Sequence, residues 1–156
     1  MKKLFPLIKP ASSLCNMRCA YCFYADVSSR REFSSRGIMP HDTAKRVIEN
    51  IFRDMADGDE VTFGFQGGEP TLAGLPWFRD FVSMAASTER KVAVRYTLQT
   101  NGLLLDKEWC EFLKAHDFLV GLSIDGGESF HDRNRLDSRG KKTYEEILRR
   151  KALLEN

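Results

Sequence analysis

The sequence has no long apolar run and almost no excess of charge of either sign. No stretch approaches the roughly 18 apolar residues of a transmembrane helix, and Pro6 and Lys9 interrupt the apolar start too early for a signal peptide. A net charge of +2 gives no sign of a nucleic-acid or membrane partner. We therefore expect a cytoplasmic protein, and 156 residues suffice for one domain with a real core.

Cysteine is scarce as well, yet three of the four cysteines fall within eight positions. Cys15, Cys19 and Cys22 follow a C-x3-C-x2-C pattern, whereas Cys110 lies far away and is expected to be buried on a helix. In a reducing compartment such a cluster favours metal binding or catalysis over a disulfide. A structural zinc site needs four ligands, whereas three thiolates on a cubane iron–sulfur cluster leave one iron open. Half of a zinc site and a loose redox pair remain as alternatives.

Histidine is the second scarce residue type, with three in the chain. His41, His116 and His131 show no metal-ligand spacing, and we expect them on the surface or at helix ends. The sequence also has no internal repeat and no low-complexity tract. Neither a histidine metal site nor a repeat architecture is therefore expected.

The spacing of apolar residues predicts alternating strands and helices. Strands are expected at 4–9, 61–65, 92–99 and 118–124. Helices are expected at 41–57, at 76–86, after Asp106 and after Thr143. The predicted helix-terminal signals are Asp42, Asp106, Gly58 and a capping box of Thr143 with Glu146. Segments 27–37 and 126–142 are predicted to be linkers. The first is rich in Ser and Arg and lacks periodicity, so we expect an exposed loop, and the second is charged, contains several glycines and joins the fourth strand to the last helix.

Strands separated by helices of this length predict βαβ units and a parallel sheet, with about four such units in the chain. Each predicted strand is followed by a motif, namely the cysteine loop, Gly-Gly-Glu-Pro at 67–70, Gln-Thr-Asn-Gly at 99–102 and Ser-Ile-Asp-Gly at 123–126. The carboxyl ends of parallel strands meet at one edge of a sheet, so we expect these motifs to form one site there.

Several segments together resemble the anaerobic sulfatase-maturating enzymes, a branch of the radical S-adenosylmethionine (SAM) superfamily. These segments are 8–13, 15–24, 63–74, 96–102, 118–126 and 131–137. The cysteine motif is typical of the whole superfamily, and segments 66–74 and 99–102 point to the branch. The resemblance implies an α/β fold, a parallel-sheet (β/α) partial barrel of the radical SAM type over residues 1–156, truncated after about four βα units. The last barrel units, the auxiliary-cluster (SPASM) domain and the family's catalytic base are expected outside this sequence, so no catalytic residue is assigned.

The resemblance also implies a [4Fe-4S] cluster and SAM as cofactors. The implied cluster ligands are Cys15, Cys19 and Cys22, and the implied SAM contacts are Tyr21, Gly68, Glu69, Ser123 and Arg135. The tyrosine would lie against the adenine, Gly68 and Glu69 at the amino group, and the serine and arginine at the ribose and carboxylate. An arginine suits a carboxylate because its planar fork binds both oxygens. Arg133 is the alternative for that role, and a tight turn is the alternative for the Gly-Gly-Glu segment.

Substrate contacts are predicted at Tyr24, Gln66, Gln99 and Asn101. The three amides follow strands and would hydrogen-bond to a peptide in an extended conformation. Core packing is the alternative for Tyr24, and turn capping is the alternative for the amides, above all for Asn101 before Gly102.

The activity implied by the resemblance is oxidation of a Cys or Ser of a sulfatase to Cα-formylglycine, through a 5′-deoxyadenosyl radical. The implied partners are the sulfatase polypeptide and a low-potential electron donor such as flavodoxin or ferredoxin. Two alternatives remain. One is a maturase that forms thioether or carbon–carbon links in another ribosomal peptide, and the other is a non-catalytic cluster- or metal-binding module.

Overall fold

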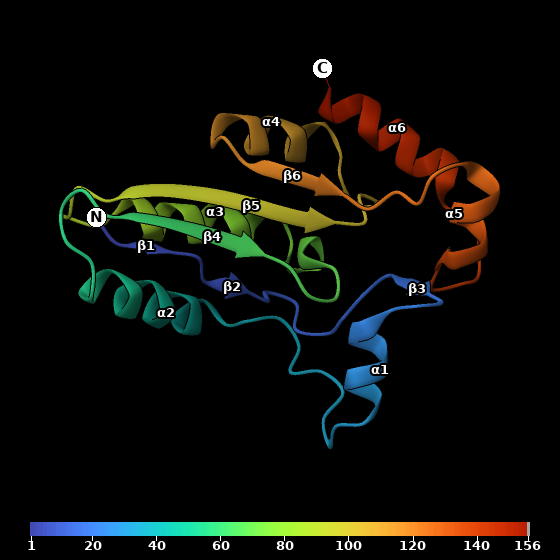
Figure 1. Cartoon of the computed structure of the whole chain (residues 1–156), viewed down its shortest axis with the longest axis horizontal. Helices are drawn as coiled ribbons and strands as arrows, with labels where there is room; N and C mark the ends of the chain where they lie inside the picture. The colour runs from blue at the N-terminus through green and yellow to red at the C-terminus, as the bar shows by residue number, and fades with distance from the viewer. Residues whose placement is uncertain (156) are drawn as a thin grey trace.

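The computed structural model describes residues 1–155 and contains one open sheet with every strand pairing parallel (Figure 1). Its strands are β1 (Lys3–Leu4), β2 (Leu7–Ile8), β4 (Glu60–Phe65), β5 (Ala93–Thr100) and β6 (Leu119–Leu122). Both β1 and β2 pair with β4, so the order runs from these short strands through β4 and β5 to β6. The predicted parallel α/β fold is confirmed, and the sheet does not close into a barrel within the described residues.

Helices connect the strands, as βαβ units require. The connecting helices are α2 (His41–Arg53), α3 (Leu75–Ala86) and α4 (Lys107–Ala115), with a 3-10 turn at Pro70–Ala73, whereas α6 (Tyr144–Leu154) follows the last strand of the described residues. Phe63 and Phe65 of β4 are buried against Phe78 and Phe81 of α3, with ring centroids 4.9–5.1 Å apart. Burying each ring contributes about 1.5–3 kcal/mol, so β4 and α3 form the centre of the core.

Two helix starts show which capping signals the structure uses. Asp106 caps α4 as predicted, because its side chain accepts a hydrogen bond from the N–H of Trp109 at 2.9 Å. Helix α2 begins at His41, as predicted, but the capping prediction for Asp42 is wrong, since the N-cap is Pro40, two residues earlier, and makes no side-chain bond. Helix α2 also ends at Arg53 rather than at 57, and Gly58 lies in the loop that follows.

The predicted capping box of the last helix is wrong as well. Thr143 stands at the N-cap position, but its hydroxyl donates to the carbonyl of Arg135 instead of capping α6. Glu146 pairs with Arg149 and Arg150 on the helix surface. The carboxylate of Asp132 takes over as cap, accepting from the N–H groups of Thr143 and Tyr144 at 3.0 Å each.

The two segments predicted as linkers contain regular structure. Helix α1 (Phe23–Ser29) runs into the first, and the second holds α5 (Glu128–Asn134) and β7 (Arg135–Asp137). Strand β7 pairs antiparallel with β3 (Met17–Cys19), which lies inside the cysteine loop. These elements are too short to produce a readable period, and the β3–β7 pair joins residues more than 100 positions apart.

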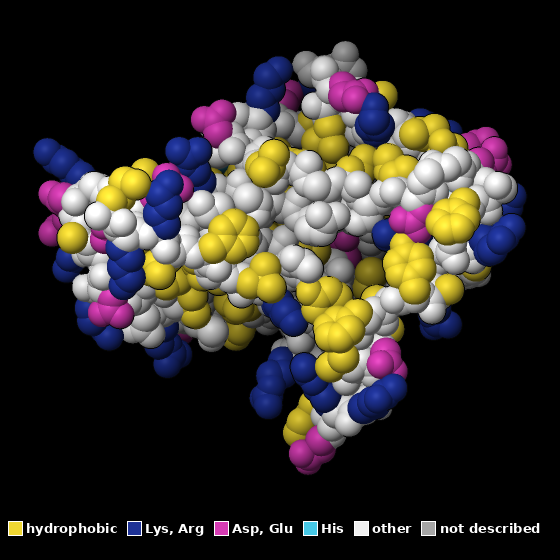
Figure 2. Space-filling view, viewed as in Figure 1, with side chains coloured by type: hydrophobic (Ala, Val, Ile, Leu, Met, Phe, Trp, Pro, Cys, Tyr) yellow, Lys and Arg dark blue, Asp and Glu magenta, His cyan; other side chains and the backbone are white. Residues whose placement is uncertain are grey.

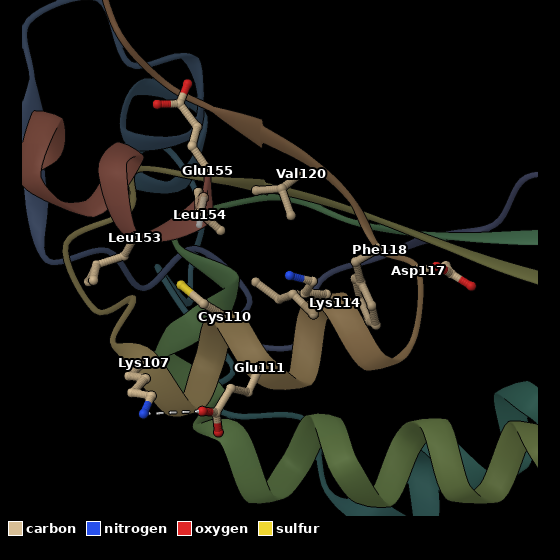
Figure 3. Close-up of a pocket in the computed structure, with 11 residues that line it drawn as sticks. Lys107, Cys110, Glu111, Lys114, Asp117, Phe118, Val120, Leu153, Leu154 and Glu155 are labelled. Carbon is tan, nitrogen blue, oxygen red and sulfur yellow. Dashed lines mark ion pairs between the residues drawn. The ribbon is translucent and has the colours of Figure 1, made fainter.

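A groove of about 800 Å³ lies between α4, β6 and the end of α6 (Figure 3). Cys110 lines it and is half-buried rather than buried, which corrects the expectation for this residue. None of the predicted site residues lines this groove. Within residues 1–155, no helix is long and apolar enough to span a membrane.

Candidate functional site

The cysteine loop lies at the edge of the sheet to which the carboxyl ends of β4 and β5 point (Figure 1). Cys19 belongs to β3, and Cys22 is the N-cap of α1, where its sulfur accepts from the N–H of Ala25 at 3.4 Å. The short β3–β7 pair holds the middle of the loop against the segment that follows β6. The cysteine loop, which is the first of the predicted motifs, therefore lies at the expected edge of the sheet.

Each of the three sulfur atoms faces an N–H donor. Cys15 accepts from the N–H of Met17 at 3.3 Å, and Cys19 lies 3.8 Å from Nη1 of Arg135. All three thiols are free. N–H donors beside sulfur stabilise thiolate charge and tune the potential of a cluster bound by it. The donor set therefore fits thiolate ligands of an iron–sulfur cluster.

Two of the three cysteines, Cys15 and Cys19, have a raised pKa. Packing around the sulfur raises the pKa of Cys15 to about 11, although the residue as a whole is exposed. Burial also raises the pKa of Cys19, and Arg135 counteracts this effect. A bound metal deprotonates such thiols outright. In the described part of the chain, no three His, Cys, Asp or Glu side chains converge tightly enough to hold a single metal ion.

The Gly-Gly turn after β4 packs directly on the start of the cysteine loop. Gly68 has a φ of +47°, and a Cβ there would lie 2.2 Å from the carbonyl oxygen of Leu14. The same carbonyl accepts from the N–H of Glu69 at 2.7 Å. Only glycine permits this approach, so the turn fixes the position of Leu14, and hence of Cys15 after it, relative to β4. Within the chain, this close backbone approach is made to Leu14, and the predicted contact of Gly68 with SAM stays a prediction.

Glu69 is 1% exposed and accepts four hydrogen bonds. Oε1 accepts from the N–H and hydroxyl of Thr71 and from the hydroxyl of Thr100, at 2.6–3.1 Å. Oε2 accepts from the N–H of Asn101 at 2.7 Å. The carboxylate thus ties the end of β4 to the end of β5. Its predicted contact with the SAM amino group stays a prediction, and the tight-turn alternative accounts for Oε1.

Asn101 connects the end of β5 to the cysteine loop. Its Nδ2 donates to Oδ1 of Asn16 at 2.8 Å and lies 3.8 Å from the sulfur of Cys15. Its Oδ1 accepts from the N–H of Leu103, which is the turn-capping geometry. Both ends of the amide are used inside the protein, so the turn-capping alternative describes Asn101 in this structure, and a role toward substrate remains a prediction.

Arg135 lies beside Cys19 and contacts half-buried Asp125 and exposed Tyr21. Its Nε is 2.9 Å from Oδ1 of Asp125, and its guanidinium lies 5.3 Å from the ring centroid of Tyr21. The hydroxyl of Tyr21 donates to Oδ2 of Asp125. Burial together with the Asp125 contact raises the pKa of Tyr21 to about 12. Arg133, the alternative to Arg135, is exposed on α5 and does not join this group.

Two further pairs unite predicted substrate and cofactor residues. Gln66 donates to the hydroxyl of Tyr24 at 3.0 Å, and Gln99 donates to the hydroxyl of Ser123 at 2.9 Å. Lys9, which sequence reasoning did not select, places its ammonium 4.6 Å from the Tyr24 ring centroid. Gln66 and Gln99 also line a groove of about 470 Å³ on the open face of the sheet. Apolar side chains are spread over this face and along α1 (Figure 2).

Besides Lys9, sequence reasoning missed two residues of this site. Asp125 stood in a motif that follows a strand, which was the signal, but no partner could be named without the fold. His131 is fully buried behind the site, so its predicted surface position is wrong. His41 and His116 are exposed at the two ends of their helices, as expected, although His41 also pairs with Asp80 at 3.3 Å.

The comparison with known protein families agrees with this geometry. The sequence model of the radical SAM superfamily matches residues 10–153. The chain belongs to the radical SAM superfamily. Its members use SAM with a [4Fe-4S] cluster, so the cofactor prediction is confirmed at the level of the family.

Several relatives of this radical SAM chain are anaerobic sulfatase-maturating enzymes, as the resemblance implied. The cysteine-type enzyme of Clostridium novyi (strain NT) is 42% identical over 149 residues, which cover 95% of this chain and 39% of the enzyme. The serine-type enzyme of Bacteroides thetaiotaomicron is 29% identical over 147 residues, which cover 94% of this chain and 35% of the enzyme. A solved structure described as native anSMEcpe with bound AdoMet matches with a TM-score of 0.87 and 38% identity, covering 98% of this chain and 41% of that one. The chain therefore spans about two fifths of the length of its relatives.

Proposed function

We propose that this chain is the cofactor-binding part of an enzyme that oxidises a Cys or Ser side chain of a sulfatase to Cα-formylglycine. The observation that carries the proposal is the meeting of three free thiols, the Gly-Gly-Glu turn and Arg135 at one edge of the sheet. The proposal is also supported by two relatives, which are described as cysteine- and serine-type anaerobic sulfatase-maturating enzymes.

The cofactor roles follow from the donor atoms present. Cys15, Cys19 and Cys22 would each bind one iron, which leaves the fourth iron for SAM. When bound, the cluster and SAM supply one-electron cleavage chemistry that no protein side chain offers. The chain's own residues would hold SAM in place and exclude side reactions.

The SAM contacts would surround the cysteine loop. Arg135 would meet the carboxylate of SAM, since its Nη1 is directed toward Cys19 and not fully used by Asp125. Tyr21 is exposed within the cysteine loop, between Cys19 and Cys22, where its ring would be available to the adenine. Ser123 would contact the ribose, and the backbone of Gly68, with Glu69 beside it, would contact the amino group.

The substrate would lie in the groove on the open face of the sheet, whose rim holds Gln66 and Gln99. Amide side chains at the ends of two parallel strands suit the backbone groups of an extended peptide. Tyr24 stands beside Gln66 and would border the same path. One solved relative is described with a bound Cp18Cys peptide, which supports a peptide as substrate.

We further propose a low-potential donor, such as flavodoxin or ferredoxin, as the source of the electron, and the cytoplasm as the compartment. The free state of all four cysteines suits a reducing environment.

The first experiment is anaerobic reconstitution of the chain with iron and sulfide, followed by electron paramagnetic resonance of the reduced protein with and without SAM. A [4Fe-4S] signal that changes with SAM, and that is lost in Cys19→Ser but kept in Cys110→Ser, is expected. Cys110 serves as the matched control because it lies in the separate groove beside α4. Tightly bound zinc without a cluster would favour the non-catalytic module.

The second experiment tests the substrate with the full-length protein that contains this chain. The reduced holoenzyme is incubated with SAM and a sulfatase peptide carrying Cys or Ser at the modified position. An aldehyde in the peptide supports the proposal. Cluster-dependent cleavage of SAM without any aldehyde would reject the sulfatase substrate, and would favour the maturation of another peptide.

A further inference from the structure

His131 is completely buried, with both ring nitrogens engaged, directly behind the cofactor site. Its Nδ1 accepts from the N–H of Asp125 at 3.3 Å, and its Nε2 lies 3.0 Å from the hydroxyl oxygen of Thr143. The ring of Tyr144 packs against it in an edge-on arrangement, with centroids 5.5 Å apart. A buried polar side chain with this many fixed partners has one orientation and very little freedom.

The hydrogen-bond network assigns the protonation state of the ring. The N–H of Asp125 can only donate, so Nδ1 must carry a lone pair. The hydroxyl proton of Thr143 is donated to the carbonyl of Arg135 at 2.8 Å, so this oxygen must accept from Nε2–H. Two independent constraints thus give the same neutral tautomer, with the proton on Nε2.

This ring joins the backbones of the two residues that form the ion pair beside Cys19. It reaches Asp125 directly and Arg135 through Thr143. The side chains of Asp125 and Arg135 then meet at 2.9 Å on the other side, and Arg135 extends to the sulfur of Cys19. These contacts form a closed ring of interactions from His131 through Asp125 and Arg135 to Thr143. A shift of the imidazole would therefore displace both partners of the ion pair.

We propose that His131, as the neutral Nε2–H tautomer, is a positioning residue of the cofactor site that sets where Asp125 and Arg135 stand relative to Cys19. This inference rests on the proposed function, because it takes the site to bind the cluster and SAM. His131 itself touches neither the cysteines nor the proposed SAM surface. Four ionisable groups face its ring: Asp125 before α5, Asp132 on α5, Arg135 on β7 and Tyr144 on α6.

Three variants separate the two hydrogen bonds from the volume of the ring. His131→Phe keeps an aromatic ring against Tyr144 and removes both bonds. His131→Asn keeps an acceptor near the position of Nδ1, and Thr143→Val removes the link to Arg135 alone. His41→Phe, on the exposed start of α2, is the matched control. His131→Phe loses the two hydrogen bonds that position Asp125 and Arg135. We therefore expect it to weaken SAM binding to the reconstituted chain about tenfold to a hundredfold.

We expect the iron content of His131→Phe to stay close to that of the unaltered chain, while the SAM-induced change of the reduced-cluster spectrum shrinks. His131→Asn should recover part of the affinity, because it restores the bond to Asp125, and His41→Phe should equal the unaltered chain. The nitrogen NMR signals of the apo chain give a readout independent of any cofactor, and they should show a neutral His131 with the proton on Nε2.

The outcomes are distinguishable. If the unaltered chain binds SAM and His131→Phe binds it equally well, the inference is overturned and the proposed function stands. A cationic ring, or a proton on Nδ1, at neutral pH also overturns it. If the unaltered chain loads a cluster but binds no SAM, the proposed function fails and the inference falls with it. Should His131→Phe not fold, His131→Asn and Thr143→Val decide the question by the same measurements.

Discussion

Oε2 of Glu69 accepts a hydrogen bond from the backbone N–H of Asn101 at 2.7 Å, and this bond joins the carboxyl ends of β4 and β5. The other carboxylate oxygen collects three donors from Thr71 and Thr100. Asn101 in turn donates to Asn16 in the cysteine loop. A single buried carboxylate therefore sets the distance between two strand ends and, through Asn101, the position of the loop that carries Cys15.

Replacement of this carboxylate is expected to destabilise the fold. In Glu69→Gln, an NH2 group must face donors that now lack an acceptor, so we expect a loss of about 2–3 kcal/mol in the free energy of unfolding. Urea unfolding of the metal-free chain measures this. Glu108→Gln is the control, since Glu108 pairs with Arg79 on the surface and its loss should cost less than about 1 kcal/mol. Unchanged stability with lost SAM binding would instead make Glu69 a ligand contact without a structural role.

The position of Gly68 against Leu14 gives a second prediction. An alanine at 68 must adopt a positive φ and also displace the Leu14 carbonyl, which a Cβ would meet at 2.2 Å. We expect Gly68→Ala to cost about 2 kcal/mol or more and to lower the iron bound on reconstitution, because the cysteine loop starts at Leu14.

Gly140→Ala separates these two effects. Gly140 has a φ of +80°, and a Cβ at this position would meet no atom within 4 Å, so its replacement carries the backbone cost alone. That cost is about 1 kcal/mol. Unfolding free energies and iron content are compared for both variants. Equal losses in the two would show that the contact with Leu14 contributes nothing.

The features that could be predicted from the sequence are those written in local or periodic patterns. The apolar residues of β4 and α3 repeat over enough positions to identify both elements. Asp106 stands directly before the first residue of α4, which is the usual position of an N-cap. The cysteine spacing is a short motif within one loop. In each case, neighbouring residues along the chain carry the whole signal.

The features that could not be predicted depend on contacts between distant segments. Arg135 reaches Cys19 because β3 and β7 pair across more than 100 residues, and neither three-residue strand has a readable pattern. The burial of His131 likewise follows from the packing of α5 against α6, whereas the sequence shows only that this histidine lacks metal-ligand spacing, from which a surface position was predicted. Glu69 was predicted only as a ligand contact. Its hydrogen bonds to Thr100 and Asn101 could not be predicted, because they depend on the register of β5 beside β4.

The buried His131 predicts how stability depends on pH. Burial, together with the nearby charge of Arg135, lowers the pKa of His131 below its ordinary value of 6.5. The unfolded chain then binds a proton more readily than the folded chain. The stabilising contribution is present in full above pH 6.5 and is lost as the pH falls below that value. Thermal unfolding of the metal-free chain at a series of pH values measures it.

We expect His131→Phe to flatten this fall on the acidic side of pH 6.5, because the variant has no proton to gain there. His41→Phe should keep the dependence of the unaltered chain. If the curve for His131→Phe runs parallel to that of the unaltered chain, another group is responsible for the acid loss.

Arg135 and Arg133 lie two positions apart and give the sharpest comparison at the site. Arg135 is 16% exposed, and it pairs with Asp125, which is 15% exposed, while its Nη1 faces the sulfur of Cys19. Arg133 is exposed on α5, and none of the ion pairs found in residues 1–155 involves it. In Arg135→Gln the half-buried Asp125 loses its cation and Cys19 loses its donor. We expect SAM affinity to fall at least about tenfold and the midpoint potential of the cluster to fall as well, because reduction adds negative charge beside a site that has lost a positive one.

Equilibrium dialysis with labelled SAM and a redox titration followed by electron paramagnetic resonance test these two effects separately. Arg133→Gln should match the unaltered chain in both measurements. A fall in affinity without a change in potential would assign Arg135 to SAM alone and leave the Cys19 contact without influence. Equal effects of the two substitutions would mean that only the overall charge of this region matters, and the specific place of Arg135 between Asp125 and Cys19 would then have no role in binding.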